Sequence, residues 1–214
     1  MDKLTLYIDR FWISPYAFSA WVALEEKGLA FETIELGLDR KDHQAPDYQS
    51  GSITGRVPAL RHGDFWLAES SAIVEYVDEI ARDPSHLALL PTNLRDRARC
   101  RQVMAWIRSD LMPIREERAT HTMFYVRASK PLSPVAEQAK QRLVFAADKL
   151  VPADRTTLFE QWSIADADLG FMLARLHING DSLPAKLVTY CETQLARPSV
   201  KKWFERERPP YVGY

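Results

Sequence analysis

The sequence is poor in the residues that build disulfide scaffolds and metal centres. Its 214 residues include two cysteines, Cys100 and Cys191, and five histidines. The cysteines lie far apart and form no C-x-x-C pair, and the histidines form no H-E-x-x-H pattern. The sequence therefore predicts no metal site. Because such sparse cysteines are typical of a reducing compartment, we expect a cytoplasmic protein.

Long apolar runs and an excess of charge of one sign are also missing. The chain has 28 Lys and Arg against 29 Asp and Glu, so it lacks the basic surplus of a protein that binds nucleic acid or anionic membranes. No stretch approaches the roughly 18 apolar residues of a transmembrane helix, and the N-terminus lacks the pattern of a signal peptide. We expect neither a nucleic-acid nor a membrane partner. A hydrophobic fraction of 46% instead indicates a globular protein with a sizeable core.

Residues 1–81 alternate between strand-like and helix-like segments. The short apolar runs that predict strands are residues 4–8, 31–36, 57–60 and 65–68. The helices are predicted from Pro15, capped by Ser14, to a stop at Gly28; near 46–49; and from Glu69 onward. This order predicts a thioredoxin-like α/β domain over residues 1–81, with two parallel strands and an antiparallel hairpin.

Helical patterns replace the strand-like runs after Pro91. Residues 82–91 have no clear period and are predicted to be a linker, followed by an all-helical domain over residues 92–214. The helices predicted there are 93–112 with an interruption at Pro113, one from Pro134 after the cap Ser133, one that begins at a capping box of Ser163 and Asp166, and one opened by Pro184.

Four stretches, in this order, resemble the glutathione S-transferase superfamily. They are ISPYAFSAW (13–21), GRVPAL (55–60), LAESSAIVEYV (67–77) and WSIADADL (162–169). Residues 98–118 are similar to the bacterial YfcF-type branch. Each motif alone is weak, whereas their succession along nearly the whole chain is specific. The resemblance implies the fold of that superfamily, a thioredoxin-like α/β domain plus an all-α domain. It also implies a homodimeric enzyme that joins the thiol of glutathione to a small hydrophobic electrophile.

The resemblance further implies where glutathione binds. A cis bond between Val57 and Pro58 would turn the backbone of Val57 toward the ligand, which could then pair there like an added strand. Glu69 and Ser70 lie at a helix start, where they would hold the ammonium and carboxylate of the γ-glutamyl group. The alternatives are an ordinary trans proline at a strand and a helix cap with a purely structural role.

Two basic residues complete the implied glutathione site on weaker grounds. His43 and Arg56 match positions that face the glycyl carboxylate in theta-like relatives, and Gln44 is a neighbour that could replace His43. A solvated loop histidine and a surface arginine are the alternatives, because the segment around His43 is irregular.

Ser14 carries the predicted chemistry. It stands where glutaredoxin-like relatives have the first cysteine of a C-P-Y-C motif, and Ala17 stands in place of the second. The reactive sulfur is therefore predicted to be that of glutathione, whose thiolate the Ser14 hydroxyl would stabilise at a helix N-terminus. Ser14 as a helix cap alone is the alternative. Tyr7 is a rival hydroxyl, but its place inside the first strand argues against it.

A second substrate is predicted to lie between the two halves of the chain. The candidate wall residues are Phe11, Trp12, Tyr16, Arg108, Met112 and Arg115. Core packing is the alternative for the apolar members. Two other functions stay open: glutathione-dependent reduction of hydroperoxides, which would use the same thiolate, and a non-catalytic binding module on this fold.

Overall fold

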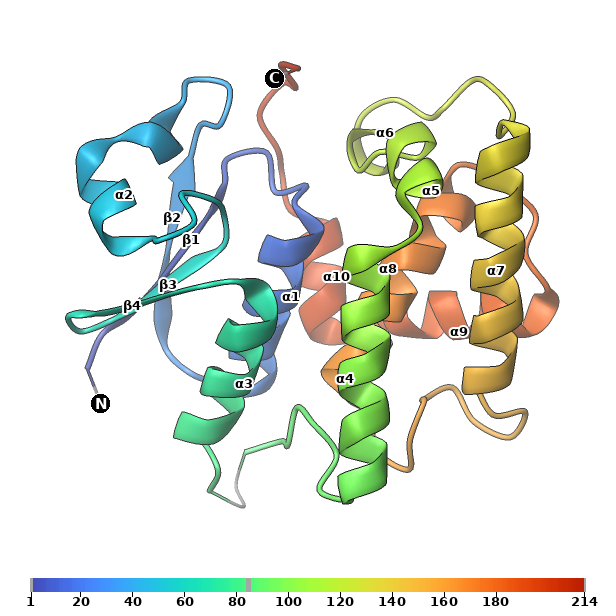
Figure 1. Ribbon diagram of the computed structural model, residues 1–214, viewed down its shortest axis with the longest axis horizontal. Helices are drawn as coiled ribbons and strands as arrows, with labels where there is room; N and C mark the ends of the chain where they lie inside the picture. The colour runs from blue at the N-terminus through green and yellow to red at the C-terminus, as the bar shows by residue number, and fades with distance from the viewer. Residues whose placement is uncertain (1, 84–85, 214) are drawn as a thin grey trace. The chain divides into compact units, whose positions relative to one another are not determined.

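The chain divides into two compact units (Figure 1). The computed structural model describes residues 2–83 and 86–213. Unit 1 comprises Met1–Leu89 together with Glu205–Tyr214, and unit 2 comprises Leu90–Phe204. Positions 84 and 85 of the predicted linker lie outside the described residues. The end of the chain thus packs with the N-terminal unit.

Unit 1 is built on a mixed four-stranded sheet in the order β2-β1-β3-β4. Its elements are β1 (Leu4–Asp9), α1 (Pro15–Glu26), β2 (Phe31–Leu36), a short 3-10 helix (Asp42–Gln44), α2 (Pro46–Gly51), β3 (Ala59–His62), β4 (Phe65–Ala68) and α3 (Ser70–Ile80). β1 is parallel to β2 and antiparallel to β3, which pairs antiparallel with β4. The predicted thioredoxin-like domain is confirmed. β3 begins two residues later than predicted, since Pro58 has no amide hydrogen for a neighbouring strand.

The two faces of the sheet have different partners. Figure 1 shows α1 and α3 on one side of the sheet and α2 on the other. Leu6 and Ile8 are fully buried on one face of β1, and Tyr7 points to the opposite face because side chains alternate along a strand. There Trp66 stacks on Tyr7 with ring centroids 4.9 Å apart, and Tyr48 of α2 lies 5.5 Å from Tyr7.

Unit 2 is helical over its described residues, as predicted. Its helices are α4 (Leu94–Ser109), α5 (Met112–Glu117), α6 (His121–Phe124), α7 (Pro134–Leu150), α8 (Ile164–Ile178), α9 (Ala185–Ala196) and α10 (Pro198–Phe204). Nearly all of α8 is buried, and it packs against both α4 and α9. The predicted capping box begins α8: the carboxylate of Asp166 accepts hydrogen bonds from the amides of Ser163 (2.8 Å) and Leu158 (2.7 Å).

The predicted helix over residues 93–112 is shorter in the structure. Asn93, the first residue of the predicted helix, is the N-cap of α4; the helix ends at Ser109, and Leu111 has a left-handed backbone with φ of 63°. Pro113 then lies in the first turn of α5, where a missing amide hydrogen costs nothing. The interruption therefore precedes Pro113, because the proline begins a new helix rather than breaking the old one.

A buried ion pair joins three segments of unit 1. Lys27, directly after α1, contacts Asp78 of α3 at 2.8 Å, and their side chains are only 1% and 7% exposed. The Lys27 ammonium also donates to the carbonyl of Ala81, while Asp78 accepts a hydrogen bond from the amide of Leu89 at 2.8 Å. Both charges therefore have polar partners, which is the condition for burying them at low cost.

We predict that Asp78→Asn lowers the free energy of unfolding by about 3–5 kcal/mol, since it leaves the Lys27 ammonium buried without its counter-charge. The neighbouring Glu79→Gln is the matched control. It removes an exposed pair with Arg82 (3.1 Å, side chains 59% and 61% exposed) and should cost less than about 1 kcal/mol. Urea unfolding followed by circular dichroism measures both. Equal losses in the two variants would contradict the role given to the buried pair.

Candidate active site

Strand register gathers the predicted site residues of unit 1 at one end of the sheet. Tyr7 of β1 lies opposite Ala59 of β3, and Ala59 lies opposite Ala68 of β4. The end of β1, the start of β3 and the end of β4 therefore meet. The loop that leads to Ser14 follows the end of β1, the Val57–Pro58 bond directly precedes β3, and α3 begins directly after the end of β4.

Ser14 is held at the N-terminus of α1 from two sides. Its hydroxyl oxygen accepts a hydrogen bond from the amide of Ala17 at 3.2 Å, which makes it the predicted N-cap. Its own amide donates to the carboxylate of Asp9 at 3.0 Å. Because the cap bond uses a lone pair of the hydroxyl, the hydroxyl hydrogen stays available to a ligand at the positive end of the helix.

Asp9 is a part of the site that the sequence did not reveal. Its side chain is fully buried at the end of β1, and its two carboxylate oxygens accept the amides of Ile13 (2.9 Å) and Ser14 (3.0 Å). Burial raises the pKa of the Asp9 carboxyl, and the two amide hydrogen bonds act in the opposite direction. The available signal was an acidic residue directly after an apolar strand, which could equally have begun a solvated loop.

The segments implied to bind the ligand backbone adopt the expected local structure. The Val57–Pro58 peptide bond is cis, as the resemblance implied. Glu69 precedes α3 as its N-cap, is exposed, and has a left-handed backbone with φ of 69°. Ser70 is the first residue of α3 and is 3% exposed. This end of the sheet thus combines a half-buried Val57 before a cis bond, an exposed carboxylate and a helix N-terminus.

The two basic residues lie on the segments that precede β3. Arg56 is exposed, and its carbonyl accepts the hydroxyl of Tyr48 at 2.7 Å, which fixes the backbone of this loop to α2. His43 lies in the 3-10 helix, and its Nδ1 atom is buried without a hydrogen-bond partner among the described residues. Contact of either residue with a ligand stays a prediction.

Tyr7 lies on the opposite side of the sheet from α1. Its ring is packed between Trp66 and Tyr48 on the face that α2 covers. Ser14, in contrast, caps α1 on the other face. Of these two hydroxyls, that of Ser14 is the one that lies at the N-terminus of α1.

The protein's own sulfurs are unsuited to nucleophilic chemistry. Cys100 and Cys191 both lie in unit 2 and are fully buried, and burial raises the pKa of each thiol to about 12. At neutral pH they hold almost no thiolate, which is the reactive form.

Within residues 2–83 and 86–213 there is no group of three His, Cys, Asp or Glu side chains that could hold a metal ion. The same residues contain no helix of the length and apolarity that crossing a membrane requires.

The candidates for the second-substrate pocket fall in both units. In unit 1, Phe11 and Trp12 are 0% and 1% exposed, and Tyr16 is half-buried. Burial this complete means that Phe11 and Trp12 act as core side chains in this structure, the alternative weighed from the sequence.

The candidate residues in unit 2 differ in how far their side chains are already used in contacts within the protein. Arg108 forms an ion pair with Asp168 of α8 at 2.8 Å, so its charge already has an internal partner. Arg115 donates to the carbonyl of Arg108 at 2.8 Å, and Met112 is 47% exposed. Of the three, Met112 offers the most side-chain surface to a ligand.

Family profiles match both units. The profile described as "Glutathione S-transferase, N-terminal domain" matches residues 13–80, and that described as "Glutathione S-transferase, C-terminal domain" matches residues 93–206. Glutathione S-transferase Z1 of Arabidopsis thaliana is 37% identical over 112 residues, which are 52% of this chain and 48% of that protein. Glutathione S-transferase 1 of Dianthus caryophyllus is 34% identical over 113 residues, 53% and 49% of the two chains. The chain thus spans about half the length of the curated relatives it matches.

Solved structures share the fold over most of the chain. A glutathione transferase homologue from Burkholderia, crystallised with bound glutathione, is 42% identical, covers 94% of this chain and 96% of its own, and has a TM-score of 0.79. The theta class glutathione S-transferase from Xanthomonas axonopodis pv. citri, with glutathione bound, shares the fold at 22% identity, 97% and 99% coverage and a TM-score of 0.75. Assignment to the YfcF-type branch stays a prediction. The chain belongs to the glutathione S-transferase family.

Proposed function

We propose that this protein binds glutathione at the end of the unit 1 sheet and transfers it to small hydrophobic electrophiles, with the Ser14 hydroxyl stabilising the thiolate. The observation that carries the proposal is the position of Ser14: its hydroxyl caps α1 and keeps its hydrogen for a ligand, in a loop that leaves the same end of the sheet where the cis Val57–Pro58 bond precedes β3. The Burkholderia relative that is 42% identical holds glutathione, which supports the choice of ligand. A cytoplasmic homodimer is the expected setting.

Each charged part of glutathione has a counterpart at this end of the sheet. The backbone of Val57 can pair with the cysteinyl amide groups, as an added strand would. The N-terminus of α3 and the hydroxyl of Ser70 suit the γ-glutamyl carboxylate, and exposed Glu69 suits its ammonium group. The glycyl carboxylate would face His43 and Arg56.

Activation of the thiol follows from the N-terminus of α1. A free thiol of this kind has a pKa of about 8.5, so only a few per cent is thiolate at neutral pH. A hydrogen bond from the Ser14 hydroxyl, together with the helix N-terminus, stabilises the negative sulfur. Lowering the thiol pKa by about two units requires roughly 2.7 kcal/mol of such stabilisation. The thiolate then forms a carbon–sulfur bond to the electrophile, which loses a leaving group or gains a proton.

The first test titrates glutathione bound to the purified protein. We expect a saturable ultraviolet thiolate signal whose apparent pKa lies well below that of free glutathione. Because the protein favours the ionised form, the signal should persist as the pH falls below 8 and be lost only below the shifted pKa. Binding without ionisation would point to a non-catalytic module, and no binding would overturn the proposal.

Ser14→Ala should reduce the turnover number with a chlorinated dinitrobenzene by about a hundredfold, because it removes one preorganised hydrogen-bond donor to a negative atom. The dissociation constant for glutathione should change little, since the peptide part of the ligand keeps its partners. Tyr7→Phe is the matched control, as it deletes the rival hydroxyl and should leave turnover near that of the wild type. The reverse pattern in the two variants would assign the thiolate to Tyr7.

Glu69→Ala should weaken glutathione binding by about 1–3 kcal/mol, because the γ-glutamyl ammonium loses its charged partner. Asp64→Ala, which removes an exposed acid from the turn between β3 and β4, is the control for a general effect of charge. Isothermal titration calorimetry measures both. An affinity unaltered by Glu69→Ala would remove Glu69 from the binding site.

A further inference from the structure

The loop between β1 and α1 contains a backbone conformation that its own residues do not favour. Trp12, two residues before Ser14, has a left-handed backbone with φ of 53°. A bulky residue in this region is strained and persists only where the surroundings hold it. The amides of Ile13 and Ser14 reach Asp9 with the loop in this conformation.

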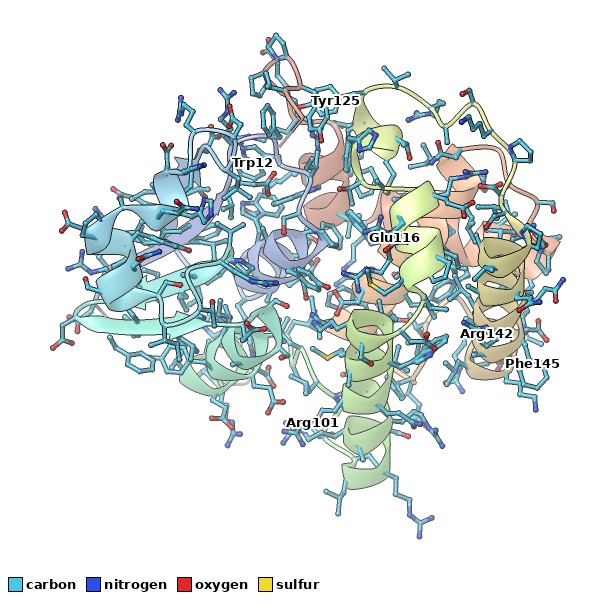
Figure 2. The ribbon with its side chains drawn as sticks, turned by 45° about the horizontal axis from the view of Figure 1, so that its top comes forward. Trp12, Arg101, Glu116, Tyr125, Arg142 and Phe145 are labelled. Atoms are coloured by element: carbon cyan, nitrogen blue, oxygen red, sulfur yellow. The ribbon has the colours of Figure 1, made fainter. Side chains whose placement is uncertain are left out.

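The side chain of Trp12 is contacted from several parts of unit 1, including an edge-on contact with Trp21 of α1, whose ring centroid lies 6.0 Å away. The indole nitrogen of Trp12 donates to the carboxylate of Glu35 on β2 at 2.6 Å. The guanidinium of Arg206, from the end of the chain, lies 3.8 Å from the centre of the Trp12 ring and 3.5 Å from the same carboxylate of Glu35. Figure 2 labels Trp12 in the loop that leads to α1. Trp12, Glu35 and Arg206 thus form one three-way contact.

The end of the chain also contacts the backbone of this loop. Arg208 directs its Nε and Nη2 atoms toward the carbonyl of Trp12, each at 3.4 Å, and its Nη1 atom donates to the carbonyl of Arg206 at 2.8 Å. Tyr211 packs edge-on against Phe11 at 5.2 Å. Residues 206–211 therefore contact the Trp12 ring, the Trp12 carbonyl and the side chain of the preceding residue, Phe11.

We propose that residues 206–211 position Ser14 for catalysis, with Arg206 acting through Trp12 as a positioning residue. This inference rests on the proposed role of Ser14 in stabilising the glutathione thiolate. Arg206 and Glu35 hold the Trp12 ring, the fixed ring keeps the left-handed backbone, and that backbone directs the next two amides onto Asp9. The direction of the Ser14 hydroxyl at the start of α1 follows from this chain of contacts.

Loss of Arg206 should affect ionisation of bound glutathione more than its affinity. The residues proposed to hold the peptide part of glutathione, Val57, Glu69 and Ser70, lie on other segments and do not depend on Trp12. Misplacing a catalytic group by about 1 Å can cost up to a hundredfold in rate. The expected signature is therefore a fall in turnover with a nearly constant dissociation constant.

The experiment compares Arg206→Ala with Arg142→Ala. Arg142, labelled in Figure 2, is a half-exposed arginine of α7 that pairs loosely with Asp110 at 3.8 Å, so its loss controls for removing one surface charge. Arg206→Ala should raise the apparent pKa of bound glutathione by about one unit, a tenfold change in ionisation, and lower turnover by about tenfold or more. Arg142→Ala should leave both unchanged.

Two further variants separate positioning from a loss of folding. Arg206→Lys keeps a cation over the Trp12 ring and should restore most of the thiolate signal. Glu35→Ala removes the acceptor of the indole from β2 and should reproduce the Arg206→Ala phenotype. The double variant should lose no more than either single one, because both act through Trp12. Circular dichroism at the assay temperature confirms that each variant is folded.

The outcomes distinguish this inference from the function on which it rests. If the wild type ionises glutathione and Ser14→Ala abolishes that ionisation, but Arg206→Ala and Glu35→Ala leave the thiol pKa unchanged, the positioning role is wrong and the proposed function stands. If Ser14→Ala leaves the thiol pKa unchanged, the proposed function itself fails. A thiol pKa raised in Arg206→Ala and restored by lysine supports the positioning role.

Discussion

The carboxylate of Asp9 determines the backbone path of the loop that leads from β1 into α1. A carboxylate in a fully buried position is costly unless hydrogen-bond donors surround it, and the nearest donors are the amides of Ile13 and Ser14. Satisfying Asp9 therefore dictates the path of the loop, and the path of the loop dictates where α1 begins. The N-cap at Ser14, the direction of its hydroxyl and the ligand position proposed for it all depend on this one buried group.

Local signals account for most of what the sequence predicted correctly. Ser14 and Ser133, each followed by proline, cap α1 and α7, and the capping box of Ser163 and Asp166 begins α8. Such signals act within three or four residues, so they can be recognised without the rest of the fold. The positions of the strands along the chain were predicted from short apolar runs, which are local signals of the same kind.

The parts that the sequence did not predict depend on contacts between distant residues. The interaction of Arg208 with Trp12 spans 196 positions along the chain, and no local pattern marks it. Asp9 looked like the first residue of a loop because burial of its carboxylate is visible only in three dimensions. The early end of α4 is similar: the left-handed backbone at Leu111 is not favoured by a leucine and reflects its buried surroundings.

The division of the chain into units has a consequence for biosynthesis. Unit 1 is discontinuous: its sheet and helices are complete by Leu89, but residues 206–211 are made only after all of unit 2. Since domains fold as they emerge during synthesis, the thioredoxin-like part can form early while the loop before α1 still lacks its last contacts. A nascent or truncated chain would thus have a folded sheet, while the loop before Ser14 would lack its contacts with residues 206–211. Completion of the loop between β1 and α1 would be among the final events in the maturation of the protein.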